Sequence, residues 1–212
     1  MKIHTFTFNP FYENTFVVAN DNGDCMIIDP GCYEKEEKEI LDNFISKNNY
    51  QVKKLINTHC HIDHVLGNAH VKKKYNVDLE GHENDIETLK AVETYAPAYG
   101  FANYESTEMN TYLKEGDTVN LGDDKFEVLF VPGHAPGHIA LYNKIEKVLI
   151  GGDVLFNGSI GRTDLPGGDF DTLAKSIKEK IYTLPDDVTV YCGHGEATSI
   201  GKEKVSNPFV KA

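Results

Sequence analysis

At 212 residues, the chain is long enough to bury one sizeable hydrophobic core, and it lies within the length range of a single domain. Its hydrophobic fraction of 40% and its charged fraction of 25% are typical of a soluble globular protein. No apolar run approaches the roughly 18 residues that a membrane span needs. The formal net charge of −12 disfavours nucleic acid and anionic membrane surfaces as partners, because both repel an acidic protein.

The first 16 residues alternate polar and apolar side chains, which predicts a strand and not the continuous apolar segment of a signal peptide. The four cysteines show no CxxC spacing, and a chain of this size needs no disulfides for stability. We therefore expect reduced thiols and a cytoplasmic protein. The oligomeric state stays open at this point.

The first half of the chain reads as strands followed by helices. Three β-rich runs predict an antiparallel meander over residues 3–8, 14–19 and 25–31. Apolar residues at helical spacing predict a helix over 34–47, and a strand over 52–58 follows it. Two further helical patterns follow over residues 67–75 and 83–93. An irregular stretch over residues 94–112, suited to a lid or pocket wall, completes this half.

The second half repeats this order. Three strands are predicted over residues 125–133, 138–143 and 147–153, and a last strand over 188–193. A helix between them is marked by apolar residues at helical spacing, namely Leu173, Ile177, Ile181 and Leu184. Two halves of this kind predict two packed sheets flanked by helical layers.

The segment NTHCHIDH, residues 57–64, concentrates possible metal ligands at the carboxyl end of a predicted strand. Residues i and i+2 of an extended chain point the same way, so His59 and His61 can share one metal ion while Cys60 faces elsewhere. If a helix begins next, Asp63 and His64 can face a second metal position. One short segment can then serve two metal ions.

Three more possible ligands follow apolar strands elsewhere in the chain. His134, Asp153 and His194 each stand beside a glycine that would let the backbone turn closely around an ion. Strand ends are where a site collects residues from distant parts of a sequence. These three residues are therefore the expected partners of the histidine-rich segment.

Together, HCHIDH, PGHAPGH, GGD and CGHG resemble the motifs of the metallo-β-lactamase superfamily. The further runs NTFVV, IDPG, GDVLFNGSIGRTDLPGGD and the closing GHG and NPF are similar to those of the short glyoxalase-II-type hydrolases. The resemblance covers nearly the whole chain. It implies an α/β fold, a four-layer αββα sandwich, formed by a single metallo-β-lactamase-like domain over residues 1–212.

The resemblance also implies the ligand set of a two-metal site. His59, His61 and His134 would hold the first ion, Asp63, His64 and His194 the second, and Asp153 would bridge them. Asp63 and Asp153 are the catalytic carboxylates by this resemblance. We expect two divalent ions, zinc first, with iron or manganese as alternatives. His61 disfavours the oxygen-reducing diiron flavoproteins of the superfamily, which typically have glutamate there.

The function that the resemblance implies is cleavage of a small hydroxyacyl thioester, such as S-lactoylglutathione, by a hydroxide held between two metal ions. Longer members carry a basic C-terminal helical region for glutathione, whereas 18 residues follow His194 here, so another thiol carrier is an alternative. A second hypothesis is a persulfide dioxygenase with one iron on His59, His134 and Asp153. A third, a noncatalytic metal-binding protein, conflicts with the complete ligand set.

Three other residues allow more than one interpretation. His138 is expected to pack near the site without binding metal. Asp29 in IIDPG could orient a ligand histidine or could simply form a turn before Pro30. Arg162 is the only arginine in the chain, and we expect it to pair with Asp164 or Asp169 in preference to a substrate.

Overall fold

The chain folds into two compact units in the computed structural model, which describes residues 1–211. The N-terminal unit contains residues 1–112 and 121–124, and the C-terminal unit contains residues 113–120 and those from 125 onward. Each unit carries one sheet, as the two halves of the sequence predict, but each sheet has six strands where the sequence predicts four. The single domain expected over residues 1–212 stays a prediction, and residue 212 lies outside the described part of the chain.

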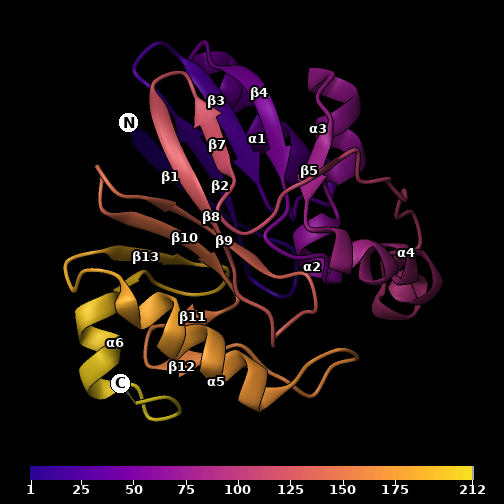
Figure 1. The fold of residues 1–212 in the computed structure, drawn as a ribbon. Coiled ribbons are helices and arrows are strands. Elements are labelled where there is room, and N and C mark those ends of the chain that lie inside the picture. Colours follow the sequence, from indigo (N-terminus) through magenta and orange to yellow (C-terminus); the bar gives the residue numbers. More distant parts are fainter. Residues whose placement is uncertain (212) are drawn as a thin grey trace. The chain divides into compact units, whose positions relative to one another are not determined.

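The sheet of the N-terminal unit has the strand order β1-β2-β3-β4-β5-β6, and Figure 1 labels the first five of these strands. Its strands are β1 (Lys2–Phe8), β2 (Glu13–Ala19), β3 (Asp24–Ile28), β4 (Gln51–Ile56), β5 (Leu79–Gly81) and β6 (Thr111–Tyr112). The first three form the predicted antiparallel meander. β3, β4 and β5 run parallel, so their carboxyl ends meet at one edge of the sheet.

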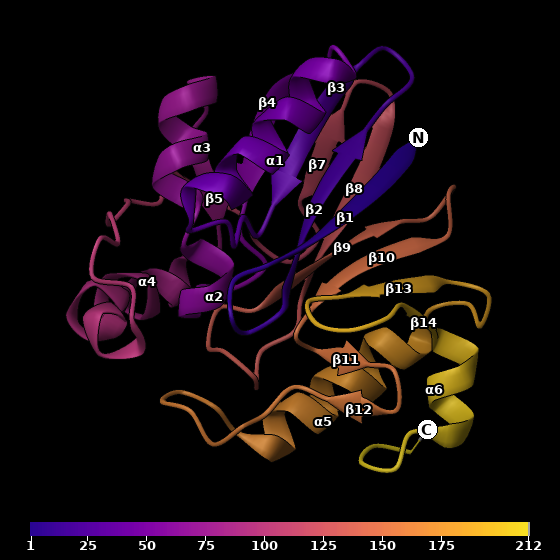
Figure 2. The same ribbon diagram turned by 180° about the vertical axis from the view of Figure 1, so that it is seen from behind.

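Helices cover one face of this sheet, as Figure 2 shows for α1. The helices of this unit are α1 (Lys35–Lys47), α2 (Ile62–Val65), α3 (Asn68–Tyr75) and α4 (Ile86–Tyr95), with 3₁₀ turns η1 (Glu83–Asp85) and η2 (Ala96–Tyr99). Leu41 and Ile45 of α1 and Val71 of α3 join a buried apolar cluster with Ile27 and Leu55 of the strands. The stretch over 94–112 is thus helical at its start and reaches the sheet only at β6.

The sheet of the C-terminal unit has the order β14-β13-β10-β9-β8-β7. Its strands are β7 (Thr118–Leu121), β8 (Asp124–Phe130), β9 (Ile139–Asn143), β10 (Val148–Gly152), β13 (Thr189–Cys192) and β14 (Thr198–Ser199). The strands β11 (Leu155–Phe156) and β12 (Ser159–Ile160) form a separate two-stranded hairpin. Because β8 and β10 are both antiparallel to β9, and β13 is parallel to β10, the strands β8, β10 and β13 end at one edge.

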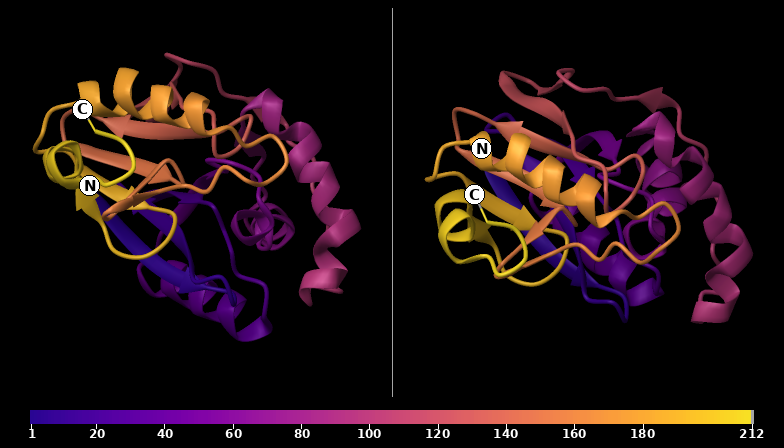
Figure 3. Two further views of the ribbon diagram at one scale, coloured as in Figure 1. Left: turned by 90° about the horizontal axis from the view of Figure 1, so that it is seen from below. Right: turned by 60° about the horizontal axis from the view of Figure 1, so that its bottom comes forward.

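Two helices accompany this sheet, α5 (Phe170–Glu179) and α6 (Ile200–Ser206), and both are visible in Figure 3 in orange and yellow. The helix that the apolar spacing predicts through Leu184 ends earlier, at Glu179, and a 3₁₀ turn η3 (Ile181–Thr183) follows. The α-helical conformation is already lost at Lys180, whose φ and ψ are −122° and −57°, and Pro185 excludes Leu184 from a helix because the residue before a proline avoids the helical region. Among the described helices, none combines the length and the apolar character that crossing a membrane requires.

Candidate metal centre

The histidine-rich segment leaves β4 in an extended form and then turns into the short helix α2. The ring centroids of His59 and His61 lie 4.8 Å apart, so the two side chains point to one side as the alternation predicts. His61 is the N-cap of α2, and Asp63 and His64 follow in its first turn. The His64 ring lies 4.1 Å from that of His59, and four of the predicted ligands are therefore together in the N-terminal unit.

Cys60, between the first two histidines, points into the core. Its side chain belongs to the apolar cluster of the N-terminal unit and is 1% exposed. Burial also raises the pKa of its thiol well above the ordinary value. This agrees with its exclusion from the predicted ligand set.

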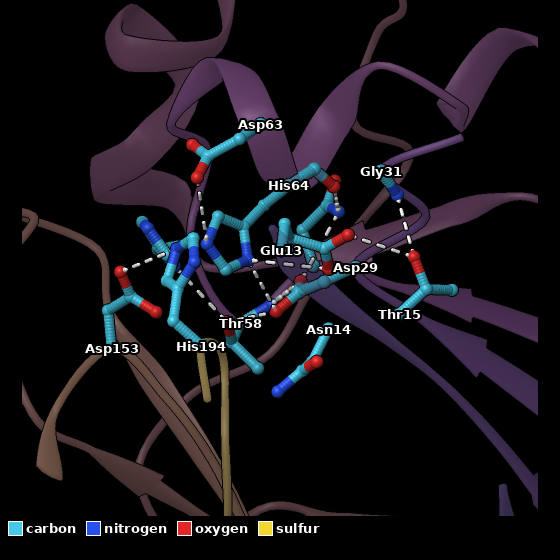
Figure 4. Close-up of polar contacts among 12 residues, drawn as sticks. Glu13, Asn14, Thr15, Asp29, Gly31, Thr58, Asp63, His64, Asp153 and His194 are labelled. Carbon is cyan, nitrogen blue, oxygen red and sulfur yellow. Dashed lines mark hydrogen bonds and ion pairs between the residues drawn. The ribbon is translucent and has the colours of Figure 1, made fainter. Parts of the chain in front are cut away.

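Asp29 anchors this segment from the end of β3 (Figure 4). Its Oδ1 accepts a hydrogen bond from the Thr58 amide at 2.7 Å, and its Oδ2 accepts from the Thr58 hydroxyl at 2.5 Å. The same Oδ2 lies 3.1 Å from Nδ1 of His64. Asp29 also has a positive φ of 49° and lies in a bend before Pro30, and its contact with His64 supports the interpretation that it orients a histidine.

The protonation of His64 follows from this contact. A carboxylate only accepts hydrogen bonds, so Nδ1 of a neutral His64 carries the proton and Nε2 carries the lone pair. That Nε2 lies 3.7 Å from Oδ2 of Asp63. Two atoms that both offer lone pairs thus face each other in a buried setting.

The C-terminal unit repeats this arrangement around Asp153, which directly follows β10. His134 donates from Nδ1 to the carbonyl oxygen of Arg162 at 2.7 Å, so its Nε2 carries the lone pair. That atom lies 3.4 Å from Oδ2 of Asp153, and Nε2 of His194 lies 3.5 Å from the same oxygen. The structure therefore brings the three predicted ligands of this unit together.

Facing lone pairs repel unless a positive charge lies between or beside them. A proton on each histidine would supply that charge, but so would a divalent cation, for which neutral imidazole and carboxylate are preferred ligands. The chemistry of these donors therefore fits divalent metal ions. The combination of the two sets into one two-metal centre stays a prediction.

Groups outside the predicted ligand set hold the surroundings of Asp153. Its backbone amide donates to Nε2 of His138 at 2.9 Å, which confirms the expected supporting role of that histidine. A Cβ built on Gly161 would lie 2.0 Å from the Asp153 carbonyl oxygen and 3.0 Å from the His134 ring. Only glycine lets the backbone approach this closely.

Arg162 pairs with Asp164, one of its two expected partners. Its Nε and one terminal nitrogen reach the two carboxylate oxygens of Asp164 at 2.7 Å each. Both side chains are exposed, so this is a local ion pair on the surface. The backbone carbonyl of Arg162, and not its side chain, supports His134.

Sequence reasoning missed three buried polar residues near the histidine-rich segment. Asn9 donates from Nδ2 to the carbonyl oxygens of Gly31 and Asp63, at 3.0 Å each. Glu13 is fully buried, accepts from the Thr15 hydroxyl, and burial raises the pKa of its carboxyl well above the ordinary value. Asp85 accepts from the backbone amide of Cys60. None of the three left a sequence signal, since Glu13 is followed by two further polar residues at the start of its strand.

Comparison with known proteins identifies relatives over the whole length of the chain. The family model of the metallo-beta-lactamase superfamily matches residues 8–194. Hydroxyacylglutathione hydrolase GloC from Haemophilus influenzae is 37% identical, over 100% of this chain and 99% of its own.

Solved structures agree with this relationship. The crystal structure of BLEG-1 B3 metallo-beta-lactamase has a TM-score of 0.91 and 31% identity, covering 100% of both chains. That of TTHA1623 in a di-iron-bound form has a TM-score of 0.86 and 33% identity, covering 98% of this chain and 100% of its own. The expected α/β metallo-β-lactamase fold is thereby confirmed.

Proposed function

Because the chain belongs to the metallo-β-lactamase superfamily, we propose that it is a two-metal hydrolase that cleaves a hydroxyacyl thioester of the S-lactoylglutathione type. The proposal that the protein binds metal is supported by pairs of lone-pair atoms that face each other in both units, His64 against Asp63 and His134 against Asp153. The thioester part is supported by the relative named hydroxyacylglutathione hydrolase, which matches the chain from end to end.

The proposed ligand set follows the family motifs. His59, His61 and His134 would hold one ion, Asp63, His64 and His194 the other, and Asp153 would bind both. Zinc is the proposed metal, with iron and manganese as alternatives, since a solved relative carries two irons. We place the enzyme in the cytoplasm, a proposal supported by four buried cysteines that are all free.

The chain's own residues prepare the site for the reaction. Asp29 holds the proton of His64 on Nδ1, and the Arg162 carbonyl holds that of His134 on Nδ1, so each histidine presents Nε2 in its neutral form. When bound, two divalent ions supply an activated water and polarise the substrate carbonyl. Water adds to the thioester carbon, the carbon–sulfur bond breaks, and the thiolate takes a proton, giving hydroxy acid and free thiol.

Metal analysis followed by three parallel assays tests this function. Natively purified protein is analysed for metal content and then assayed for cleavage of S-lactoylglutathione, for cleavage of a chromogenic β-lactam, and for oxygen uptake with a glutathione persulfide. We expect close to two ions per chain and thioester cleavage well above the other two activities. The β-lactam assay is included because one relative is named a B3 metallo-beta-lactamase.

Each alternative outcome points elsewhere. The persulfide dioxygenase hypothesis would replace the proposal if the protein held a single iron, if added zinc did not change this metal content, and if the protein took up oxygen with the persulfide. Preferential β-lactam cleavage would leave the two-metal site in place and overturn the substrate. A chain that takes up no metal would overturn the whole proposal.

A further inference from the structure

The segment that carries His59 and His61 leaves β4 between two neighbouring strands, and a buried carboxylate follows each of them. β4 lies between β3 and β5 in the sheet. Asp29 comes directly after β3 and holds the Thr58 amide. Asp85 comes four residues after the end of β5, and it holds the segment from the other side.

The contact made by Asp85 is short and buried. Its Oδ2 accepts a hydrogen bond from the backbone amide of Cys60 at 2.7 Å, and the side chain is 1% exposed. A bond of this length between an amide and a carboxylate is typical of charge-assisted hydrogen bonds, which are about twice as strong as neutral ones. Since Cys60 is the single residue between His59 and His61, fixing its amide fixes the backbone on which both imidazoles are mounted.

The obvious structural alternative is a helix cap. Asp85 occupies the N-cap position of α4, where aspartate commonly accepts a hydrogen bond from the first turn. Its side chain makes no such capping bond to α4. The Oδ1 atom accepts at 3.5 Å from the Thr88 hydroxyl, which is a weak contact at best. Capping therefore does not account for the 2.7 Å bond of this carboxylate to Cys60, 25 residues away in sequence.

We propose that Asp85 is a positioning residue for metal binding, which holds His59 and His61 in their ligand geometry through the Cys60 amide. It touches neither metal nor substrate. Without this bond, the segment between β4 and α2 would lose its support on the β5 side, and the two imidazoles would have to be ordered again when an ion binds. The inference rests on the proposed function, because it assumes that His59 and His61 bind metal.

The test compares metal affinity in three variants of the full-length protein. Asp85→Ala removes the acceptor, Asp85→Asn keeps an oxygen that can accept from the Cys60 amide but removes the charge, and Glu83→Gln removes an exposed carboxylate from the same turn. Binding of Co²⁺ and Zn²⁺ to metal-free protein is measured by competition with a chromogenic chelator. The absorption spectrum of the Co²⁺ forms reports ligand geometry, and thermal unfolding without metal reports folding.

We expect Asp85→Ala to bind metal at least about 10-fold more weakly, as for other groups that orient ligands, and to shift the Co²⁺ spectrum. Asp85→Asn should fall between Asp85→Ala and the wild type, and Glu83→Gln should match the wild type. If Asp85→Ala does not fold, Asp85→Asn decides, since its loss of affinity must then exceed that of Glu83→Gln.

Wild-type affinity and an unchanged Co²⁺ spectrum in a folded Asp85→Ala variant, or in Asp85→Asn if Asp85→Ala does not fold, would overturn the positioning role alone. A wild-type protein that binds neither ion would overturn the proposed function, and this inference with it. The two failures are thus distinguished by the wild-type titration.

Discussion

The carboxylate of Asp29 contacts Nδ1 of His64 at 3.1 Å while it also accepts from both the amide and the hydroxyl of Thr58. One side chain therefore sets the proton position of a candidate ligand and fixes the backbone just before His59. The contacts are divided between the two carboxylate oxygens. Oδ1 accepts from the Thr58 amide, and Oδ2 contacts both the Thr58 hydroxyl and Nδ1 of His64. The residue is fully buried, so water cannot replace it.

Asp29→Asn should weaken metal binding by about 10- to 100-fold, because the amide cannot accept at both positions and the His64 proton is no longer held on Nδ1. We expect the loss mainly at the ion bound by His64, so that elemental analysis after dialysis gives close to one ion per chain. Asp24→Asn, at the opposite end of β3, is the matched control and should keep both metal ions. Full metal content in Asp29→Asn would show that His64 needs no orienting carboxylate.

The candidate ligands could be recognised in the sequence because their signal is local. His59, His61, Asp63 and His64 lie within six residues, and their spacing alone sets which side chains share a side of an extended segment and a helix turn. His134, Asp153 and His194 each follow an apolar strand directly or closely. Their gathering at one sheet edge follows from strand direction, since β8 and β10 each pair antiparallel with β9 and β13 is parallel to β10.

Asp85 and Asn9 could not be predicted because their partners are backbone groups. The amide of Cys60 and the carbonyl of Asp63 have no sequence signature, and the pairs are 25 and 54 residues apart. Helix α6 was missed for another reason. It has seven residues, too few to show an amphipathic period, and only the N-cap Ser199 marks its start.

Gly161→Ala should damage the support of Asp153 and His134. The new Cβ would lie 2.0 Å from a backbone carbonyl oxygen, which cannot move like the end of a flexible side chain, so the hairpin or the ligands must shift. We expect thermal and urea unfolding to show a loss of about 1–3 kcal/mol, together with weaker metal binding.

The control for this change is Gly158→Asn, in the same hairpin. Gly158 has a positive φ that asparagine tolerates, and a Cβ there meets nothing within 4 Å. Metal affinity should stay at the wild-type value in this variant. Equal behaviour of the two variants would mean that the close approach at Gly161 is unimportant.

Asp42 links α1 to α3 and should make stability depend on pH. Its carboxylate accepts from the Tyr75 hydroxyl at 2.7 Å and contacts Lys74 and His70 at 2.9 and 3.1 Å. Burial alone would raise the pKa of this carboxyl, but the hydrogen bonds from Tyr75, Lys74 and His70 outweigh it and lower the pKa. The ionised form therefore stabilises the fold above the unfolded pKa of about 3.9, and this contribution is lost as pH falls through the lower folded value.

Asp42→Asn should lower the free energy of unfolding by about 1–3 kcal/mol at neutral pH, because three donors lose a charged acceptor. The difference from wild type should shrink as pH falls below about 4, where the wild-type carboxyl also becomes protonated. Urea unfolding of the metal-free proteins over this pH range measures the difference in the free energy of unfolding, and the exposed Asp123→Asn serves as the control. A difference that stays constant down to about pH 2 would contradict the assigned pKa shift.

Asp153→Asn tests whether the two proposed ions work as a unit. The Oδ2 atom of Asp153 lies 3.4 Å from Nε2 of His134 and 3.5 Å from Nε2 of His194, and these two histidines belong to different ions in the proposed ligand set. Asparagine keeps the size of the side chain but removes the negative charge. Its oxygen can still bind one ion, whereas its NH₂ group cannot bind the other, so a bridge between two ions should fail.

We expect Asp153→Asn to lose metal mainly at one position and to lose at least about 100-fold in kcat/KM for the thioester, equivalent to roughly 2.7 kcal/mol of transition-state stabilisation. Folding should survive, because the backbone amide that donates to His138 is unchanged by the substitution. Exposed Asp171→Asn, in the first turn of α5, controls for the loss of one charge in the same unit. Thioesterase activity within a few-fold of wild type, with both ions still bound, would rule out Asp153 as the bridge, and the activated water would then have to be held by one ion alone.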